Sequence, residues 1–437
     1  MGKEKISIFW FRRDLRLQDN CGLYHALSGE FPVLPIFIFD KNILDDLADK
    51  SDARVSFIHQ ELRQINKHLK AKATGLKTFY SNPLEAFEKL CSNYEIDTVY
   101  INRDYEPYAL ERDREIEKYL KGVGAKFKTY KDQVIFEKDE ITKDDGSAYL
   151  VYTPYSKKWL STITDSHLEA YTSGLMFENW LKRANENIIS LEEMGFTKST
   201  LEIPSKKLSD HTIDVYEEER NYPVKDSTSR LGIHFRFGTV SIRAIAKQAQ
   251  GKEITFLKEL IWREFFMCIL YHYPKVVDHN FNSKYDGLKW RNNKADFEKW
   301  CEGKTGYPLV DAGMRELNET GFMHNRVRML VASFLCKHLL IDWKWGEAYF
   351  AEKLLDYELA SNNGNWQWTA GTGVDASPYF RVFNPTTQIE KFDKDRVYIK
   401  RWVKEFGTAD YPTEMVEHKS AREHAIAAYK EAVSLVI

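Results

Sequence analysis

One stripe of side chains in the second half of the chain has the residue types needed to bind a flat ring. Between Phe256 and Tyr273 apolar residues recur at helical spacing, and Glu259, Trp262 and Arg263 stand at positions i, i+3 and i+4. Side chains at these positions share one face of a helix. A carboxylate, an indole and a guanidinium on one face could stack a ring and hydrogen-bond its edge. A surface ion pair beside a core tryptophan would give the same pattern.

A second helical run repeats this spacing with Asn325, Arg328 and Met329. Polar side chains opposite an apolar run usually mark a solvated helix face, so this run alone is uninformative. Further along, Trp366 and Trp368 are separated by about 200° around a helix. One indole could therefore face a core while the other faces a ligand.

The segment Thr228–Leu231 (TSRL) carries two hydroxyls and an arginine shortly before a helix-like run that begins near Val240. Hydroxyls, backbone amides and an arginine at a helix entry could cradle a phosphate. An ordinary N-cap needs only one of those hydroxyls, so both interpretations stay open. The sequence has no HxxxH or HExxH spacing and no nucleophile elbow, and we predict no metal site.

The first 130 residues alternate short apolar runs with longer amphipathic ones, which is typical of a parallel sheet covered by helices. No GxGxxG follows the first apolar run, so the dinucleotide fingerprint is absent. From about residue 196 the spacing is helical. We therefore predict a Rossmann-like α/β domain at 1–130, a linker at 131–195 and an all-helical domain at 196–437. The predicted strands are Ile6–Phe11, Val33–Phe39, Lys77–Tyr80, Thr98–Ile101 and Lys126–Tyr130.

The composition is that of a soluble globular protein, with 43% hydrophobic and 29% charged residues. No apolar run reaches the roughly 18 residues of a membrane span, and no signal peptide precedes the first strand, so we expect a cytoplasmic protein. The five cysteines follow no disulfide or zinc spacing. The net charge of -2 hides a charge of -6 over 1–220 and +4 over 221–437, where eight of the eleven tryptophans lie. Such a half could form a nucleic-acid surface, but the charge alone favours a large helical core with a slightly basic solvated face.

Several long motifs resemble the photolyase/cryptochrome flavoprotein family along nearly the whole chain. Within that family the sequence looks most like the class I photolyases, which repair cyclobutane pyrimidine dimers. The motifs are FWFRRDLRLQDN at 9–20, ELIWREF at 259–265, GKTGYPLVD at 303–311, MHNRVRM at 323–329, NNGNWQW at 362–368 and PYFRVFNPTTQIEKFD at 378–393.

The resemblance implies an α/β antenna domain and a helical domain that holds reduced FAD and opens toward DNA. Arg328 and Asp356 would pair beside the isoalloxazine ring, and Asn362 would face its N5 atom. Glu358 departs from the family, whose members usually carry Asp there. The residues expected to hold FAD are Tyr216, Thr228, Ser229, Arg230, Leu231, Arg328, Asp356, Glu358 and Asn362.

The resemblance also implies a pocket for a flipped-out dimer, with Trp262 and Trp368 as its walls. Light-excited reduced FAD would pass an electron to the dimer, the cyclobutane ring would open, and the electron would return. Glu259 would hydrogen-bond a base carbonyl, which requires a protonated or shared carboxyl that desolvation favours. The residues expected to bind the substrate are Glu259, Trp262, Arg263, Asn325, Arg326, Met329, Trp368 and Arg381, of which Arg326 and Arg381 would contact phosphates.

Three further tryptophans, Trp366, Trp343 and Trp290, match the family's electron-transfer chain, although three core tryptophans would look the same. With Glu259 and Asn325 they form the predicted catalytic set. Glu106 lies in a segment that resembles the family's antenna-facing segment and would contact a folate such as methenyltetrahydrofolate. A deazaflavin, a second flavin or an empty antenna pocket stay open.

Two other functions remain within the family. A cryptochrome would sense blue light without repair, but plant and animal cryptochromes tend to carry Asp or Cys where this chain has Asn362. The chain also runs only to Ile437, without the long tail of many cryptochromes. Enzymes for the (6-4) photoproduct place two histidines near the lesion, whereas this chain has His324 followed by Asn325. The expected partner is UV-damaged DNA, bound by a monomer.

Overall fold

The chain folds into two compact units, each built from separate stretches of sequence. The computed structural model describes residues 2–176, 178–183 and 186–434. The α/β unit comprises Met1–Glu137, Ile163–Lys207 and Leu231–Gln248, and the helical unit comprises Lys138–Thr162, Leu208–Arg230 and Ala249–Ile437. The predicted linker at 131–195 is thus divided between the two units. A polar segment without hydrophobic periodicity, such as 131–195, does not indicate which core it packs against. The roles predicted for the three domains stay predictions.

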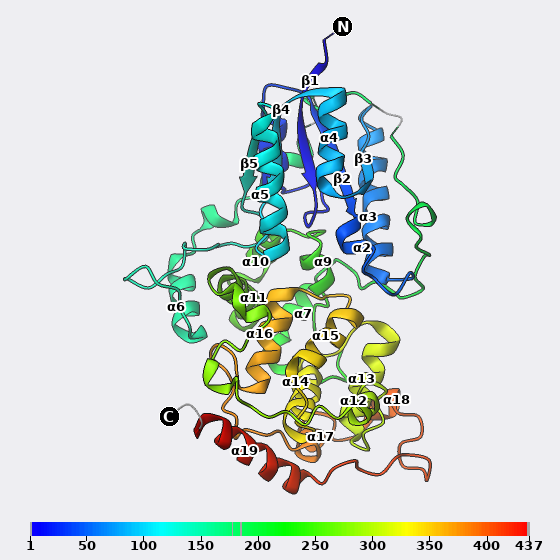
Figure 1. Cartoon of the computed structure of the whole chain (residues 1–437), viewed down its shortest axis with the longest axis vertical. Helices are drawn as coiled ribbons and strands as arrows, with labels where there is room; N and C mark the ends of the chain where they lie inside the picture. The colour runs from blue at the N-terminus through cyan, green and yellow to red at the C-terminus, as the bar shows by residue number, and fades with distance from the viewer. Residues whose placement is uncertain (1, 177, 184–185, 435–437) are drawn as a thin grey trace. The chain divides into compact units, whose positions relative to one another are not determined.

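A parallel five-stranded sheet forms the centre of the α/β unit, as the alternating apolar runs predicted (Figure 1). Its order is β3-β2-β1-β4-β5. All of β2 and most of β1 are buried, which explains why these strands are apolar throughout instead of alternating. The strands are β1 (Glu4–Phe11), β2 (Val33–Asp40), β3 (Lys77–Ser81), β4 (Tyr94–Asn102) and β5 (Lys126–Tyr130).

Helices complete the α/β unit, and α4 and α5 pack against each other and on the sheet (Figure 1). An asparagine or aspartate side chain accepts a backbone N–H at the start of several of them, which satisfies a donor that the helix leaves unpaired. The helices are α1 (Cys21–Leu27), α2 (Lys41–Leu44), α3 (Ala53–Lys70), α4 (Pro83–Asn93), α5 (Pro107–Gly122), α9 (Gly232–Arg236) and α10 (Ile242–Ala249), with short helices η1 (Asp165–Leu168), η2 (Thr172–Leu175) and η3 (Glu192–Met194).

Buried charges of the opening motif hold distant parts of the α/β unit together. Asp132 accepts from Arg16 at 2.7 Å and from Arg243 at 2.7 Å. Arg243 also pairs with Asp19 at 2.8 Å. Burial alone would raise the pKa of Asp132, but the two guanidinium groups outweigh it and lower that pKa. Much of the motif at 9–20 therefore serves the structure of this unit.

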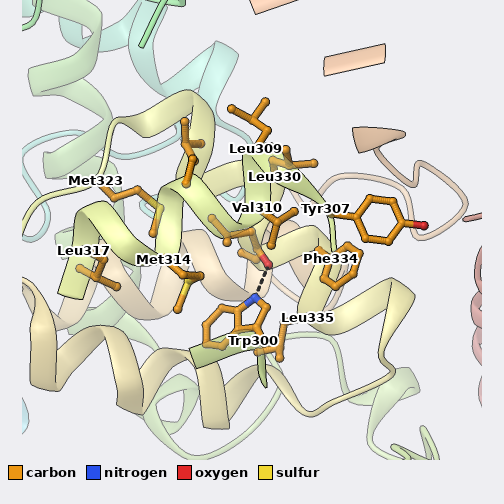
Figure 2. Packing of buried hydrophobic residues seen from close by; sticks show 14 of the residues in the cluster. Trp300, Tyr307, Leu309, Val310, Met314, Leu317, Met323, Leu330, Phe334 and Leu335 are labelled. Atoms are coloured by element: carbon orange, nitrogen blue, oxygen red, sulfur yellow. Dashed lines mark hydrogen bonds between the residues drawn. The ribbon is translucent and has the colours of Figure 1, made fainter. Parts of the chain in front are cut away.

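The helical unit has an apolar core in which Trp300 is fully buried (Figure 2). The Trp300 indole donates to the backbone oxygen of Val331 at 3.1 Å, so its one polar atom is satisfied. None of the helices in the described part of the chain combines the length and apolar character of a membrane span. The helices are α6 (Tyr152–Thr162), α7 (Asp210–Asp214), α8 (Tyr216–Glu219), α11 (Ile254–His272), α12 (Lys294–Cys301), α13 (Pro308–Thr320), α14 (Asn325–Ser333), α15 (Trp343–Lys353), α16 (Leu359–Ala370), α17 (Pro385–Phe392), α18 (Val397–Trp402) and α19 (His418–Ser434), with short helices η4 (Pro274–Val277), η5 (Ser283–Tyr285) and η6 (Phe334–His338).

Candidate active site

A cavity of about 320 Å³ lies in the helical unit, where α11, α14, α15 and α16 contribute its walls. This volume is at the lower end of the roughly 300–1,000 Å³ of small-molecule sites. The cavity brings together most of the side chains that the sequence motifs singled out. These residues are Glu259, Trp262, Arg263, Asn325, Arg328, Met329, Asp356, Glu358, Asn362, Trp366 and Trp368.

The two tryptophans of α16 both reach the cavity, so the expectation that one would face a core and the other a ligand holds only in part. Trp366 is 2% exposed and also packs on Phe350, with ring centroids 5.0 Å apart. Gly346 of α15 permits this packing, because a Cβ there would lie 2.1 Å from the Trp366 ring. Trp368 is half-buried. The cavity therefore has one rigid indole in its core-side wall and a second, more accessible one.

Arg328 and Asp356 form a bidentate ion pair in the cavity wall. The two N–H···O distances are 2.9 and 3.2 Å, and the Arg328 Nε donates to the Met323 backbone oxygen at 2.7 Å. Their side chains are 24% and 21% exposed. Such a planar pair offers a ligand both charged donors and acceptors in fixed positions. The contact between the Arg328–Asp356 pair and a flavin stays a prediction.

Asn362 presents an amide oxygen because its amide nitrogen is already engaged. The Asn362 Nδ2 donates to the Glu347 carboxyl at 2.8 Å and to the Glu347 backbone oxygen at 3.1 Å. Burial raises the pKa of Glu347, while the bond from Asn362 acts in the opposite direction. Oδ1 of Asn362 is thereby oriented as an acceptor. Sequence reasoning missed Glu347, which lies fifteen residues from Asn362 with no motif to link them.

Glu259 is paired with a residue that sequence reasoning missed. Arg220 donates to the Glu259 carboxylate at 2.6 Å and lines the same cavity. Burial acts against the Arg220 charge, but Glu259 and Tyr216 outweigh it and raise the pKa of Arg220. Glu259 is also 33% exposed. The Glu259 carboxylate is therefore an acceptor in this contact, and its hydrogen bond to a base carbonyl stays a prediction.

Arg263 lines the cavity, but its guanidinium donates to Glu358 at 3.1 Å. The two side chains are 11% and 6% exposed. The longer Glu358 thus reaches an arginine on α11, and its carboxylate also accepts from the Ser361 hydroxyl at 3.2 Å. Arg263 positions Glu358 in this geometry, and direct contact between Arg263 and a substrate stays a prediction.

Comparison with known proteins links this cavity to one family. Residues 7–172 match the family "DNA photolyase", and residues 256–409 match "FAD binding domain of DNA photolyase". The deoxyribodipyrimidine photo-lyase of Agrobacterium fabrum is 35% identical over 97% of this chain and 97% of its own length. The chain belongs to the DNA photolyase family. All the cavity-lining residues that the motifs predicted from Glu259 onward lie inside the matched FAD-binding segment.

Solved photolyase structures share the fold. A bacterial class III photolyase from Agrobacterium tumefaciens superposes with a TM-score of 0.85 at 32% identity, covering 99% of this chain and 98% of its own. A cryptochrome from Synechocystis sp. also superposes with a TM-score of 0.85, at 25% identity, covering 98% of this chain and all of its own. The photolyase family and its FAD-binding domain are therefore established, whereas these likenesses do not select a class within the family.

The chemistry of the cavity fits FAD, the cofactor of this photolyase domain. The cavity supplies aromatic walls, a bidentate ion pair and the acceptor oxygen of Asn362, which suit a flat ring with polar edges. Just before Thr228–Leu231, the segment predicted to hold the diphosphate, the Ser227 hydroxyl is buried and has no hydrogen-bond partner among the described residues. An unpaired buried hydroxyl is costly unless a ligand satisfies it.

Other residues predicted to hold FAD lie outside the cavity lining. Tyr216 packs edge-on against Phe256, with ring centroids 5.0 Å apart, and Thr228 and Ser229 are half-buried. Arg230 adopts the left-handed conformation, with φ of 50°, and pairs with Asp226 at 3.2 Å. Gly232 begins α9 just after Leu231, so this segment does precede a helix, but one of only five residues. Their contacts with FAD stay predictions.

The other two tryptophans of the predicted chain, Trp343 and Trp290, do not line the cavity. Trp343 is 1% exposed and its indole donates to Asn280 at 2.9 Å. Trp290 is half-buried and packs edge-on against Tyr429, with ring centroids 6.2 Å apart. Two indoles of the predicted chain, Trp366 and Trp343, are thus buried, and the third, Trp290, is half-buried. Electron transfer among them stays a prediction.

Three arginines form a positive cluster, Arg220, Arg326 and Arg381. Burial lowers the pKa of Arg326, and the charges of Arg220 and Arg381 act in the same direction. Burial also lowers the pKa of Lys337 to about 8, again with Arg381 contributing. Arg326 donates to Asn221 and lies over the Phe392 ring. An anion bound beside Arg326 would offset the repulsion from the neighbouring arginines, and a DNA phosphate is such an anion.

Glu106 precedes α5 in the α/β unit, and its carboxylate is held by two arginines. It accepts from Arg13 at 3.1 Å and from Arg236 at 2.5 Å. An antenna molecule that contacts Glu106 must therefore share the carboxylate with these guanidinium groups or displace them. The antenna role of Glu106, and the identity of any antenna, stay predictions.

Replacing His324 by Asn is expected to reduce the acid sensitivity of the fold. His324 caps α14 by accepting the Arg326 backbone N–H at 3.2 Å. Burial lowers its pKa to about 4, and the charges of Arg328, Arg326 and Arg230 act in the same direction. Between pH 4 and the ordinary histidine pKa of about 6.5, His324 therefore binds a proton in the unfolded chain but not in the folded protein. The free energy of unfolding consequently falls as the pH falls.

Asparagine can cap the same helix without titrating. Urea unfolding between pH 7 and pH 5 should show wild-type stability falling more steeply than that of His324→Asn, by up to roughly 1.4 kcal/mol per pH unit. Identical pH slopes for the two proteins would contradict the assignment.

Proposed function

We propose that this protein repairs cyclobutane pyrimidine dimers in DNA in a light-driven reaction. One observation supports this proposal most directly. A single cavity of the FAD-binding domain combines two indole walls, the Glu259–Arg220 pair, Asn325 and Met329 with the Arg328–Asp356 pair and Asn362. The first group suits a flipped-out dimer, and the second suits the edge of a flavin. Bound reduced FAD, when excited by light, supplies the electron for ring opening.

The tryptophans Trp262 and Trp368 hold the lesion in this proposal. A dimer pairs and stacks poorly, so moving it out of the duplex costs less than the few kcal/mol that a normal base costs, a class of reaction for which the photolyases are a known example. Stacking on an aromatic wall then recovers roughly 1–3 kcal/mol per base. Both indoles reach the cavity and both are half-buried, as entry from DNA requires.

Glu259 and Arg220 act on the base carbonyl where negative charge develops during ring opening. The guanidinium is a charged donor, and the carboxylate that accepts from it at 2.6 Å orients it. A donor fixed in advance stabilises developing charge more than one that must reorient. A direct hydrogen bond from Glu259 to the carbonyl would need a carboxyl that is protonated or shares a proton with the base.

Arg326 and Arg381 contact the phosphates beside the lesion in this proposal, so binding should weaken as the salt concentration rises. The positive charges of Arg220 and Arg381 close to Arg326 support this role. Unlike the aromatic walls, these contacts do not distinguish damaged from undamaged DNA, and they set the affinity for both.

A cryptochrome function is the second candidate, because the likeness to the Synechocystis sp. cryptochrome extends over nearly the whole chain. Repair of the (6-4) photoproduct is less favoured. The single histidine beside Asn325, His324, is 3% exposed, caps α14 and is not among the described residues that line the cavity.

The deciding experiment measures loss of lesions in light and dark. The purified protein, reduced and loaded with FAD, is incubated with an oligonucleotide that carries one cyclobutane dimer and with a matched one that carries a (6-4) photoproduct. We expect loss of the cyclobutane dimer in blue light only. Repair of the second lesion instead would select the (6-4) function. A light-induced absorption change without repair of either lesion would support the cryptochrome function.

Replacing Trp366 by Phe is expected to suppress the light-driven reduction of oxidised FAD, with little effect on repair by chemically reduced protein. Phenylalanine keeps the packing of the buried ring on Phe350 but is harder to oxidise than an indole. The measurement is flavin absorbance during illumination with an external reductant. Trp300→Phe is the matched control, since Trp300 is also buried and lies 6.2 Å from Trp366. Suppression by the control variant alone would assign the role to Trp300.

A further inference from the structure

A ring outside the cavity lining covers one face of Trp262. The Tyr152 ring lies parallel to the Trp262 ring, with centroids 3.6 Å apart and an angle of 5° between the planes. Tyr152 is the first residue of α6, is 9% exposed, and is not among the described residues that line the cavity. The face of Trp262 that Tyr152 covers is therefore not available to a ligand in the cavity.

Further contacts fix the position of Tyr152 itself. Its hydroxyl donates to the backbone oxygen of Lys258 at 2.8 Å, one turn before Trp262 in α11. Its ring packs edge-on against Phe265, with centroids 5.9 Å apart. Stacking and a hydrogen bond thus attach one side chain to two consecutive turns of α11, and Trp262 cannot rotate freely while they persist.

Tyr152 is also tied to the second wall of the cavity. Its backbone N–H donates to the Asp375 carboxylate at 3.0 Å. Asp375 has a φ of 46° and lies in the segment after α16, where the Ser377 N–H donates back to the backbone oxygen of Trp368 at 3.1 Å. One residue therefore links the helix that carries Trp262 to the segment anchored on Trp368.

We infer that Tyr152 is a positioning residue for lesion recognition, which holds the two indole walls in their binding arrangement before the ligand arrives. An indole that is already fixed pays no ordering cost on binding, and this saving appears as affinity. The inference rests on the proposed function, because it assumes that Trp262 and Trp368 receive the dimer. It adds a residue from α6, a helix that neither the motifs nor the cavity lining includes.

The test is dark binding of FAD-loaded protein to a dimer-containing oligonucleotide and to its undamaged counterpart. Tyr152→Leu removes the stacking partner and should weaken binding of the dimer about three- to tenfold, with binding of undamaged DNA unchanged. Tyr152→Phe keeps the ring and should bind the dimer nearly as wild type does. Tyr155→Leu is the control, since Tyr155 is buried in the same helix and packs on Phe265, whose ring centroid lies 5.3 Å away. It should lower the melting temperature without changing the ratio of the two affinities.

The possible outcomes distinguish failure of the inference about Tyr152 from failure of the proposed function. Equal dimer preference in wild type and Tyr152→Leu would overturn the inference while leaving the proposed function intact. A Tyr152→Leu protein that loses FAD, or that fails to fold although Tyr155→Leu folds, would overturn it by assigning Tyr152 a role in the core. Wild-type protein that binds both oligonucleotides equally would contradict the proposed function itself, and the inference with it.

Discussion

Arg328→Met is expected to lose FAD. The substitution leaves the Asp356 carboxylate beside the cavity without its bidentate partner, and it also removes the bond to Met323. A hydrogen bond to a charged group contributes about 1.5–3 kcal/mol, so losing the Arg328 contact with FAD should cost roughly 2 kcal/mol, or about 30-fold in FAD affinity. The measurement is a titration of the apoprotein with FAD, followed by flavin fluorescence.

Arg315 provides a closely matched control for this prediction. It makes a bidentate pair with Glu405 at 2.6 and 2.9 Å and donates through Nε to the Gly303 backbone oxygen at 3.0 Å, outside the cavity. Its exposure, 21% against 29% for Glu405, is also similar. Arg315→Met should lower stability by a comparable amount and leave FAD affinity unchanged. Equal loss of FAD in both variants would show that the effect of Arg328 is general destabilisation.

Glu259→Gln is expected to reduce repair per absorbed photon about tenfold, while FAD content and DNA binding stay near wild type. Glutamine keeps the size of the side chain but neither forms an ion pair with Arg220 nor shares a proton with a base carbonyl. Loss of a complete hydrogen-bond donor in other active sites costs about 10²–10³ in rate, and Glu259→Gln should cost less because it only loosens the Arg220 donor that the carboxylate orients. The measurement is dimer loss against photons absorbed, with chemically reduced protein.

Two further variants sharpen this result. Glu253→Gln changes the cap of the same helix, which accepts the Thr255 N–H at 2.8 Å outside the cavity, and should not affect repair. Arg220→Gln separates the roles of the two side chains, because a loss larger than that of Glu259→Gln assigns the carbonyl contact to the guanidinium. Unchanged repair in Glu259→Gln would remove Glu259 from the mechanism.

The predicted parts of the site are those in which local spacing determines geometry. Glu259 and Trp262 share a helix face whatever the rest of the chain does, and so do Arg328 and Met329. The family motifs predicted that both faces line the same cavity. Strands β1 and β2 were predictable for a similar reason, since a strand buried on both faces must be apolar throughout.

The missed residues act through contacts between distant parts of the chain. Arg220 reaches Glu259 across 39 residues, and Tyr152 reaches Trp262 across 110. Neither lies in a motif or on a periodic apolar face, so no local pattern distinguishes it from a surface residue.

The discontinuous α/β unit has a consequence for synthesis on the ribosome. Arg243, which pairs with Asp19 and Asp132, belongs to the third stretch of that unit and follows residues 208–230 of the helical unit. At about 5–20 residues per second, the roughly 40 residues from 208 to 248 take about 2 to 8 seconds to be made. During that interval Asp19 and Asp132 are already part of the nascent chain, whereas Arg243, their partner, has not yet been translated. A fragment that ends at residue 207 is therefore an incomplete folding unit, although it contains the whole sheet.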